Sequence, residues 1–532
     1  MKKPSEDTGL IARSAGTVSI AVMCSRVLGL VREQAFAFMF GAGFAFDAFV
    51  VAFRIPNLLR DLFGEGALSA AFVAVFSDYD ANKGEAATWK LASNVLVFFG
   101  ILLSIITLVG IFFAEPLVRF MVDADFEAIP NKVALTRLLT MIMFPFLVLI
   151  SLSSVVMGVL NTKGRFFVPA MASSFFNIGS LLGGVTLAFV LGRQGHPSIV
   201  GMAIGTLIGG GLQLVWQLPT LKKAGFSFTP GLNLADPGLR RILRLMVPAL
   251  IGLAPLQVNV LVNTYFASSL AEGSLSWLNY AFRLFWLPVG LFGVAMSTAA
   301  MPVISRYAAL KDMESLRDAC VSALTMAFCL TIPAAAGLIL LGEPIVRVIF
   351  EHGRFDAFTT IKTAEALSFY AMGLFAYSSV KIMVPVFYAL DDTKYPVIGS
   401  FLAMGSNVLV IFATIHTLQH KALAFSISCA MTLNFLFLIT MLYRKLNGLP
   451  LIYLFEGLGK VIIGTGAMVL WLIFLGRSSA LALLQGQGIA LEILSLFISI
   501  GSGAVLYGFM LHVFKLRELN VIVEKLVGRI RG

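Results

Sequence analysis

Apolar residues recur along the chain in stretches long enough to cross a membrane, separated by short polar segments, from Gly9 almost to the carboxy terminus. About 20 apolar residues in a helix span the roughly 30 Å of hydrocarbon in a bilayer. The pattern therefore predicts an all-α polytopic membrane protein with fourteen transmembrane helices. The expected spans are 10–39, 46–78, 90–114, 133–160, 168–192, 198–221, 241–268, 275–304, 317–341, 361–389, 396–418, 422–443, 457–476 and 487–514.

The first two of these spans contain charged side chains. They are Arg26, Arg32, Glu33, Asp47, Arg54, Arg60, Asp61 and Glu65. A charge at bilayer depth costs about 2.5 to 3.5 kcal/mol on insertion scales, so several of them together exclude a position in lipid. We expect these side chains to face a polar interior, with the remaining helices forming the wall around it.

Residues seven apart lie on one face of an ideal helix, and several of the charges follow that spacing. Asp47, Arg54 and Asp61 form one stripe, and Ser25 shares a face with Arg32. One interpretation is that arginines and carboxylates pair and fix the helix packing. The other is ligand binding, since the planar guanidinium suits bidentate contact with phosphate. The second interpretation predicts an anionic, phosphorylated ligand.

An internal repeat organises the chain. The segment Glu115-Pro116-Leu117-Val118-Arg119 returns as Glu343-Pro344-Ile345-Val346-Arg347, an offset of 343 minus 115, or 228. Ala52-Phe53-Arg54 returns as Ala281-Phe282-Arg283 at offset 229, which also relates Ser69 to Thr298. We expect two six-helix lobes, residues 1–225 and 226–445, followed in 446–532 by two further transmembrane helices and an amphipathic basic tail.

Each predicted lobe has an even number of spans, so both enter the membrane in the same direction. Such parallel repeats are related by an axis along the membrane normal, and their binding site lies between the lobes near mid-depth. Arg54 and Arg283 are then equivalent cavity residues. Ser69 and Thr298 are predicted to mark the two sides of one gate at the cytoplasmic ends of their spans.

Composition narrows the function. Of 532 residues 58% are hydrophobic and 13% charged, and the net charge is +11. The basic residues lie mostly in short loops on the side of the amino terminus, which predicts cytoplasmic termini and argues against nucleic-acid binding. The sequence has no Gly-x-Ser-x-Gly, no phosphate-cradling Gly-Lys-Ser/Thr loop and no His-Glu-x-x-His motif. These absences favour a secondary transporter over an enzyme or an ATP-driven pump, and no cofactor or metal site is expected.

Several segments resemble the MurJ (MviN) lipid II flippase family of bacteria, a branch of the multidrug/oligosaccharidyl-lipid/polysaccharide (MOP) exporter superfamily. In the first two spans they are Ser25-Arg26-Val27-Leu28-Gly29, Phe40-Gly41-Ala42-Gly43, Pro56-Asn57-Leu58-Leu59-Arg60 and Glu65-Gly66-Ala67-Leu68-Ser69. In the eighth span they are Tyr280-Ala281-Phe282-Arg283-Leu284 and Pro288-Val289-Gly290-Leu291-Phe292-Gly293. The resemblance extends over most of the chain.

The resemblance implies fourteen helices in the bacterial inner membrane and a substrate, lipid II, the undecaprenyl-pyrophosphate-linked precursor of peptidoglycan. By motif, the required cavity arginines of the family correspond to Arg26, Arg32, Arg60 and Arg283, and its polar cavity and gate positions to Ser25, Asp47 and Glu65. The expected partners are lipid II, membrane lipids and cell-wall synthesis proteins. The expected energy source is the membrane potential or a monovalent cation gradient. Some members bind sodium, for which Asn259, Asn263 and Asn407 are only loose candidates here.

Two alternatives stay open at this point. The chain could export another polyprenyl-linked glycan or amphiphile, or it could be an intramembrane transferase or phosphatase acting on the same lipid. A flippase moves its substrate unchanged, whereas an enzyme alters it.

Overall fold

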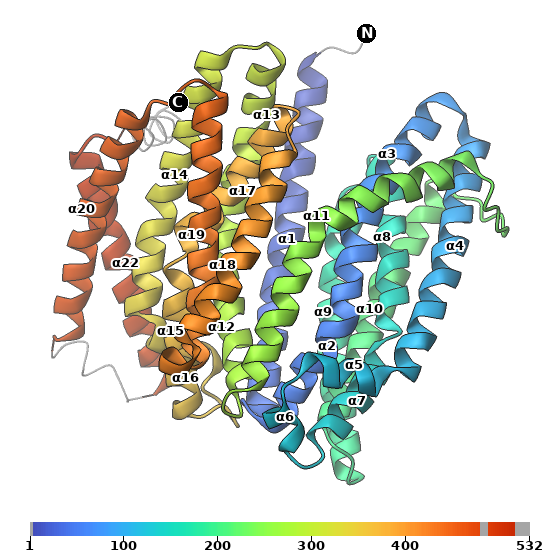
Figure 1. Ribbon diagram of the computed structural model, residues 1–532, viewed down its shortest axis with the longest axis horizontal. Helices are drawn as coiled ribbons and strands as arrows, with labels where there is room; N and C mark the ends of the chain where they lie inside the picture. The colour runs from blue at the N-terminus through green and yellow to red at the C-terminus, as the bar shows by residue number, and fades with distance from the viewer. Residues whose placement is uncertain (1–3, 479–487, 517–532) are drawn as a thin grey trace. The chain divides into compact units, whose positions relative to one another are not determined.

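The computed structural model describes residues 4–478 and 488–516 of the chain, and every regular element in these two ranges is a helix (Figure 1). The helices form two compact units, which divide between Ser276 and Trp277, inside α12. The predicted boundary between the two six-helix lobes, at residues 225 and 226, comes from the internal repeat and stays a prediction. The predicted basic tail lies almost wholly outside the described residues.

The first unit contains α1 to α11 with one π-helix. Its elements are α1 (Pro4–Phe40), α2 (Phe44–Arg60), η1 (Asp61–Gly66), α3 (Ala67–Asn82), α4 (Glu85–Phe112), α5 (Ala114–Met121), α6 (Ala124–Ala128), α7 (Lys132–Met143), α8 (Phe146–Thr162), α9 (Phe167–Arg193), α10 (Ile199–Lys223) and α11 (Pro237–Ser268), and α12 (Ser274–Pro288) begins at its end.

The second unit continues from α12. Its elements are η2 (Val289–Val294), α13 (Ala295–Ala309), α14 (Met313–Leu340), α15 (Gly342–Phe350), α16 (Ala357–Ala371), α17 (Leu374–Ala389), α18 (Lys394–Leu418), α19 (His420–Lys445), α20 (Leu451–Gly476) and α22 (Ile489–Val513).

Eleven helices in the described ranges are long and apolar enough to cross a membrane, and the bent pair α16–α17 brings the number to twelve. This confirms a polytopic membrane protein but not the predicted count of fourteen. The other two predicted spans, 10–39 and 46–78, are helical as α1 and as α2–η1–α3. The second of these stretches carries the charged residues Asp47, Arg54, Arg60, Asp61 and Glu65.

Local sequence explains where several helices begin. Asp236 precedes α11, and its carboxylate accepts hydrogen bonds from the backbone N–H groups of Gly238 (2.7 Å) and Leu239 (3.2 Å). Pro237 at the first helical position leaves no unsatisfied donor. Asp312 and Asp356 accept equivalent bonds at the starts of α14 and α16. Such caps satisfy N–H groups that have no partner within the helix.

The internal repeat is present in the structure of each unit. The π-helix η1 occupies residues 61–66 and η2 occupies 289–294, an offset of 289 minus 61, or 228. A Cβ added at Gly64 would meet the Ser151 hydroxyl at 3.1 Å, and one at Gly293 would meet that of Ser378 at 2.8 Å. The same distortion therefore packs against the same kind of neighbour in both units.

Other elements repeat at the same spacing. α7 and α8 are separated by a short break, as are α16 and α17, which are bent by 46°. The short helices α5 and α15 both carry the Glu-Pro-x-Val-Arg segment, and in each an arginine pairs with the glutamate one turn earlier. Because helices, breaks and ion pairs recur in order, the sequence repeat reflects a repeated structure.

Each unit has its own apolar core. In the first, Phe72, Phe76 and Phe99 are fully buried between α3, α4 and α8. In the second, α20 and α22 pack beside α14 (Figure 1), and the Tyr507 hydroxyl donates to the Cys329 carbonyl at 2.7 Å. The carboxy-terminal helix pair is thus anchored to α14 by both apolar packing and a buried hydrogen bond.

Candidate functional site

The predicted binding residues of α1 begin where this helix packs against α9. The Asn177 side-chain amide donates to the Ser25 carbonyl at 3.0 Å and lies 3.5 Å from its hydroxyl. Gly29, one turn further, also faces Asn177, and a Cβ there would stand in ordinary contact with the Asn177 side chain at 3.6 Å. This contact fixes the height of α1 along α9 and with it the positions of Arg26 and Arg32.

Arg32 is held from two sides. One of its terminal nitrogens lies 2.8 Å from the Glu33 carboxylate, and its guanidinium carbon lies 5.2 Å from the centre of the Phe176 ring on α9. Only 11% of the Arg32 side chain and 6% of Glu33 are exposed. A guanidinium over an aromatic face keeps its planar orientation, which prepares it for bidentate contact with an anion. Arg26, by contrast, is exposed.

At the end of α2, Arg60 makes a two-pronged pair with its neighbour Asp61, at 3.1 Å through Nε and 2.7 Å through a terminal nitrogen. A quarter of the Arg60 side chain is exposed. Arg54 is half-buried, one residue before the buried Ile55 and Pro56. Arg32 and Arg60 therefore pair with carboxylates, while the side chains of Arg54 and Arg60 are partly accessible, and both interpretations of the arginines stay predictions.

Asp47 is buried and fully engaged by protein donors. Its carboxylate lies 3.3 Å from Lys132 Nζ on α7 and accepts hydrogen bonds from Gly273 N (2.8 Å), Ser276 N (3.0 Å) and Ser276 Oγ (2.5 Å). Lys132 and Asp47 are 1% and 2% exposed at their side chains. We call Asp47, Lys132, Gly273 and Ser276 the clasp. It caps the amino-terminal turn of α12 and joins it to α2 and α7.

Glu272 and Gly43 support the clasp. The Glu272 carboxylate accepts from Phe44 N at 3.0 Å and lies 3.9 Å from Lys132 Nζ. Gly43 has a φ of +143°, in the range that favours glycine, and a Cβ there would stand 3.2 Å from the same carboxylate. The Phe40-Gly41-Ala42-Gly43 motif thus forms the turn that brings α2 under Glu272.

The predicted gate positions are placed as follows. Glu65 lies in η1, but its side chain is outside the described part of the structure. Ser69 is half-buried in the first turn of α3. In the second unit Thr298 is exposed on α13, where its hydroxyl donates to the Val294 carbonyl at 2.9 Å, and Arg283 is exposed on α12.

Two lysines of the membrane-spanning helices were not singled out by sequence analysis. Lys132 forms the clasp, and its ammonium also lies 4.6 Å from the Phe126 ring centre. Lys381 is exposed on α17, with its ammonium 5.8 Å from the ring centres of both Trp286 and Tyr377. A lysine inside an otherwise apolar stretch is a readable signal at Lys381, whereas Lys132 is the first residue of α7 and gives no such signal.

A metal centre has no support among the described residues, where no group of three or more His, Cys, Asp or Glu side chains comes together. The loose sodium candidates Asn259 and Asn263 lie one turn apart on α11, and Asn263 donates to the Asn259 carbonyl at 2.7 Å. Asn407 is completely buried in α18. None of these contacts identifies a cation site.

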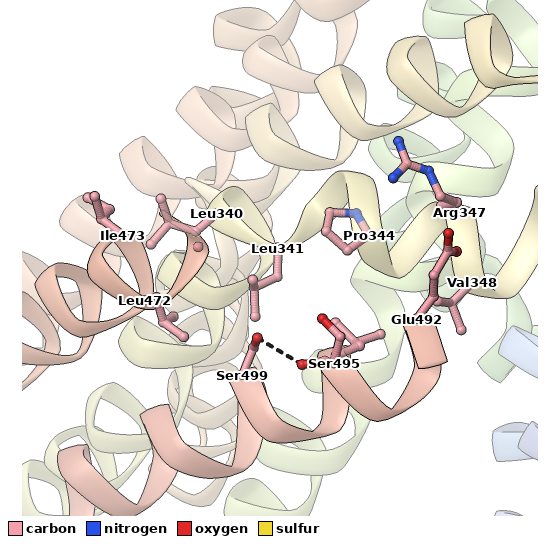
Figure 2. A pocket seen from close by; sticks show the side chains of 12 residues that line it. Leu340, Leu341, Pro344, Arg347, Val348, Leu472, Ile473, Glu492, Ser495 and Ser499 are labelled. Atoms are coloured by element: carbon pink, nitrogen blue, oxygen red, sulfur yellow. Dashed lines mark hydrogen bonds between the residues drawn. The ribbon is translucent and has the colours of Figure 1, made fainter. Parts of the chain in front are cut away.

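Two surface pockets lie outside the predicted binding residues. One, of about 260 Å³, is lined by α14, α15, α20 and α22, and Figure 2 shows Arg347 and Glu492 at one edge with leucines opposite. The other, of about 710 Å³, is lined by α4, α5 and α7 and includes Arg119 and Arg137. Arg119 and Arg347 are repeat equivalents, so the Glu-Pro-x-Val-Arg segment borders a pocket in each unit.

The second pocket has a charged rim centred on Glu115 in the short helix α5, outside the spans. Glu115 accepts from Arg137 at 2.9 Å and from Arg119 at 3.0 Å. Hydrogen bonds from Arg137 and then Arg119 lower the pKa of the Glu115 carboxyl below its ordinary value. Both contacts therefore favour the ionised form of the carboxyl group.

The structure combines two features. Its helical units repeat at a fixed offset, and arginines lie inside the spans, which is typical of a membrane transporter. Among solved structures, an inward-facing multidrug resistance MATE family transporter of the MOP superfamily has a TM-score of 0.66 at 15% identity, over 82% of this chain and 98% of that one. At this identity the likeness shows the fold alone. The fold is that of the MOP exporters.

Closer relatives identify the family. The family model "Lipid II flippase MurJ" matches residues 36–497. The lipid II flippase MurJ of Burkholderia cenocepacia is 36% identical over 440 residues, covering 81% of this chain and 84% of the relative. A solved lipid II flippase MurJ in an inward closed conformation has a TM-score of 0.77 at 26% identity, over 93% and 98% of the two chains. The chain therefore belongs to the MurJ lipid II flippase family, which confirms the prediction of a transporter and not an enzyme.

Proposed function

We propose that this protein moves lipid II from the cytoplasmic to the periplasmic leaflet of the bacterial inner membrane by alternating access. The pyrophosphate binds to arginines of a polar cavity, namely Arg26, Arg32, Arg54, Arg60 and Arg283, with Ser25 beside them. The prenyl chain stays in lipid. Fourteen spans in two six-helix lobes and a carboxy-terminal pair, with both termini in the cytoplasm, form the frame.

The observation that carries this proposal is the state of Arg32. It lies within a helix of the membrane domain, its side chain is only 11% exposed, and its guanidinium lies against the Phe176 ring while pairing with Glu33. A charge inside a membrane costs free energy, and such residues are therefore usually functional. A pyrophosphate offers several oxygens to such a planar fork of donors.

The clasp belongs to the same proposal as a gate. Asp47 holds the first turn of α12 through three hydrogen bonds while Lys132 neutralises its charge. Alternating access requires one end of the cavity to close while the other opens. A buried, fully satisfied ion pair that forms in one state and breaks in the other is suited to hold a closed end.

The energy source in this proposal is the membrane potential or a monovalent cation gradient. Moving one elementary charge through 100 mV is worth about 2.3 kcal/mol, which shifts a two-state equilibrium nearly 50-fold. We expect transport to stop when the potential and the ion gradients are both collapsed, whether or not ATP is present.

Transport is tested in vesicles containing the purified protein and lipid II, with a membrane-impermeant reagent that modifies the headgroup on the outer leaflet. We expect wild-type protein to expose the inner-leaflet pool and Arg32→Ala to leave it protected, with Arg193→Ala, an exposed arginine at the end of α9, as the matched control. Recovered lipid II must be chemically unchanged, which excludes an enzyme. Equal transport of an unrelated polyprenyl-linked glycan would favour the broader exporter function instead.

A further inference from the structure

Lys381 carries an ammonium group at the middle of α17, the second helix of the membrane-spanning pair α16–α17. No carboxylate lies within 4 Å of it in the described part of the chain, and its side chain is exposed. An unpaired ammonium facing lipid would cost several kcal/mol, so Lys381 must face a polar space.

Two aromatic rings flank this lysine. Its ammonium lies 5.8 Å from the ring centre of Trp286 on α12 and equally far from that of Tyr377, one turn earlier on α17. The two rings meet edge to face with their centres 5.6 Å apart, and Trp286 also meets Phe282 at 6.0 Å. Each of these rings is only half-buried. The two half-buried rings and the ammonium therefore present an apolar face and a positive charge to the same space.

Arg283 lies on the same helix as Trp286, three residues earlier, so the two side chains emerge on neighbouring positions of one face. Arg283 is also exposed. The second unit therefore gathers two cations and two accessible aromatic rings on α12 and α17. The repeat does not predict this arrangement, because position 381 minus 228 is Ser153, which carries no charge.

We propose that Lys381, Trp286 and Tyr377 form a subsite for the sugar-phosphate junction of a prenyl-linked glycan, with the ammonium on a phosphate oxygen and the rings against the adjoining sugar. This proposal rests on the proposed function and adds which part of the substrate the subsite recognises. Ammonium groups bind phosphate as point charges, and the apolar face of a pyranose ring packs on aromatic side chains. A free anion would bind to the ammonium without using the rings. The two aromatic rings therefore indicate a ligand that carries a sugar next to its phosphate.

Binding to purified full-length protein in lipid nanodiscs tests both halves of the subsite, with lipid II and sugar-free undecaprenyl pyrophosphate as the two probes. We expect Lys381→Gln to weaken both probes by about tenfold or more, the loss typical of a charge-assisted hydrogen bond, and Lys381→Arg to keep most of the affinity. Trp286→Leu should weaken lipid II and leave the sugar-free probe unchanged. The matched control is Lys362→Gln, a lysine 5.7 Å from the Phe358 ring that also has a carboxylate partner, Glu365.

A labelling experiment tests the position of Lys381 without relying on affinity. With the four native cysteines replaced, Lys381→Cys should react with a water-soluble maleimide and be protected by lipid II, whereas Leu409→Cys, 71% exposed on α18, should stay unlabelled in lipid. Wild-type binding by the folded Lys381→Gln variant, or an unreactive cysteine at 381, overturns the subsite. If the wild-type protein neither binds nor moves lipid II, the proposed function itself fails.

Discussion

Removing the Asp47 carboxylate should destabilise the protein more than any change to the exposed cations. In Asp47→Ala, Lys132 loses its nearest counter-ion while remaining 1% exposed, and two N–H groups and one hydroxyl at the start of α12 lose their acceptor. Breaking a buried ion pair from one side costs about 3–5 kcal/mol. Loss of a helix cap adds about 1 kcal/mol. We therefore expect a loss of about 4–6 kcal/mol in the free energy of unfolding.

Two further variants separate the charge from the cap. Asp47→Asn retains an oxygen that can accept from Gly273 and Ser276, so it should lose about 3–5 kcal/mol, the part that comes from the unpaired ammonium. Adding Lys132→Met removes that ammonium. Because replacing both members of a buried pair is often nearly neutral, the double variant should be more stable than Asp47→Asn alone.

Equilibrium unfolding of the purified protein in mixed micelles measures these differences, with thermal midpoints as a second readout. The double-mutant cycle gives a coupling energy, expected in the range of about 1–3 kcal/mol for groups in direct contact. Simple additivity of Asp47→Asn and Lys132→Met would refute the claim that the pair acts as a unit. If Asp47→Ala is no less stable than Asp47→Asn, the capping role is refuted.

Three other perturbations follow from the structure. Arg32→Ala and Arg283→Ala should each abolish transport at normal protein levels. Lysine at either position should restore little transport because it lacks the planar fork of donors. Full complementation by the alanine variants in depleted cells would exclude a ligand role. Glu115 has a lowered pKa in the folded protein, so the stability it provides is present above its unfolded pKa and is lost as the pH falls through the lowered folded pKa. The resulting fall in the thermal midpoint at acid pH should shrink in Glu115→Gln. Gly293→Ala should be more destabilising than Gly64→Ala in thermal unfolding, because its Cβ would approach a serine hydroxyl to 2.8 Å instead of 3.1 Å; equal midpoints would contradict this ranking.

The sequence was most informative where structure follows local pattern. Long apolar stretches predicted the helices, and the offset of 228 to 229 predicted a repeat that the paired π-helices and the short helices α5 and α15 bear out. The charged positions in α1 and α2 were visible because a charge inside an apolar stretch is rare. Family motifs then narrowed the protein class further than periodicity could.

What the sequence did not reveal are contacts made over long separations. Asp47 meets Ser276 across 229 residues, and no helical wheel of α2 contains that information. The wheel placed Asp47 on one stripe with Arg54, whereas the structure buries Asp47 in the clasp and leaves Arg54 half-buried. Lys381 was missed because no repeat partner marked it, and its aromatic neighbours come partly from another helix.

The π-helix η1 changes the angular phase of the second helical stretch. A π segment closes its hydrogen bonds one residue later than an α-helix, and one residue corresponds to about 100° of rotation. Side chains on α3 are therefore turned relative to the stripe that begins on α2. This rotation lets the upstream half carry Arg54 and Arg60 while the downstream half packs Phe72 and Phe76 into the core. A single continuous stretch can thus direct its two halves to different surroundings, and the same device recurs at η2 in the second unit.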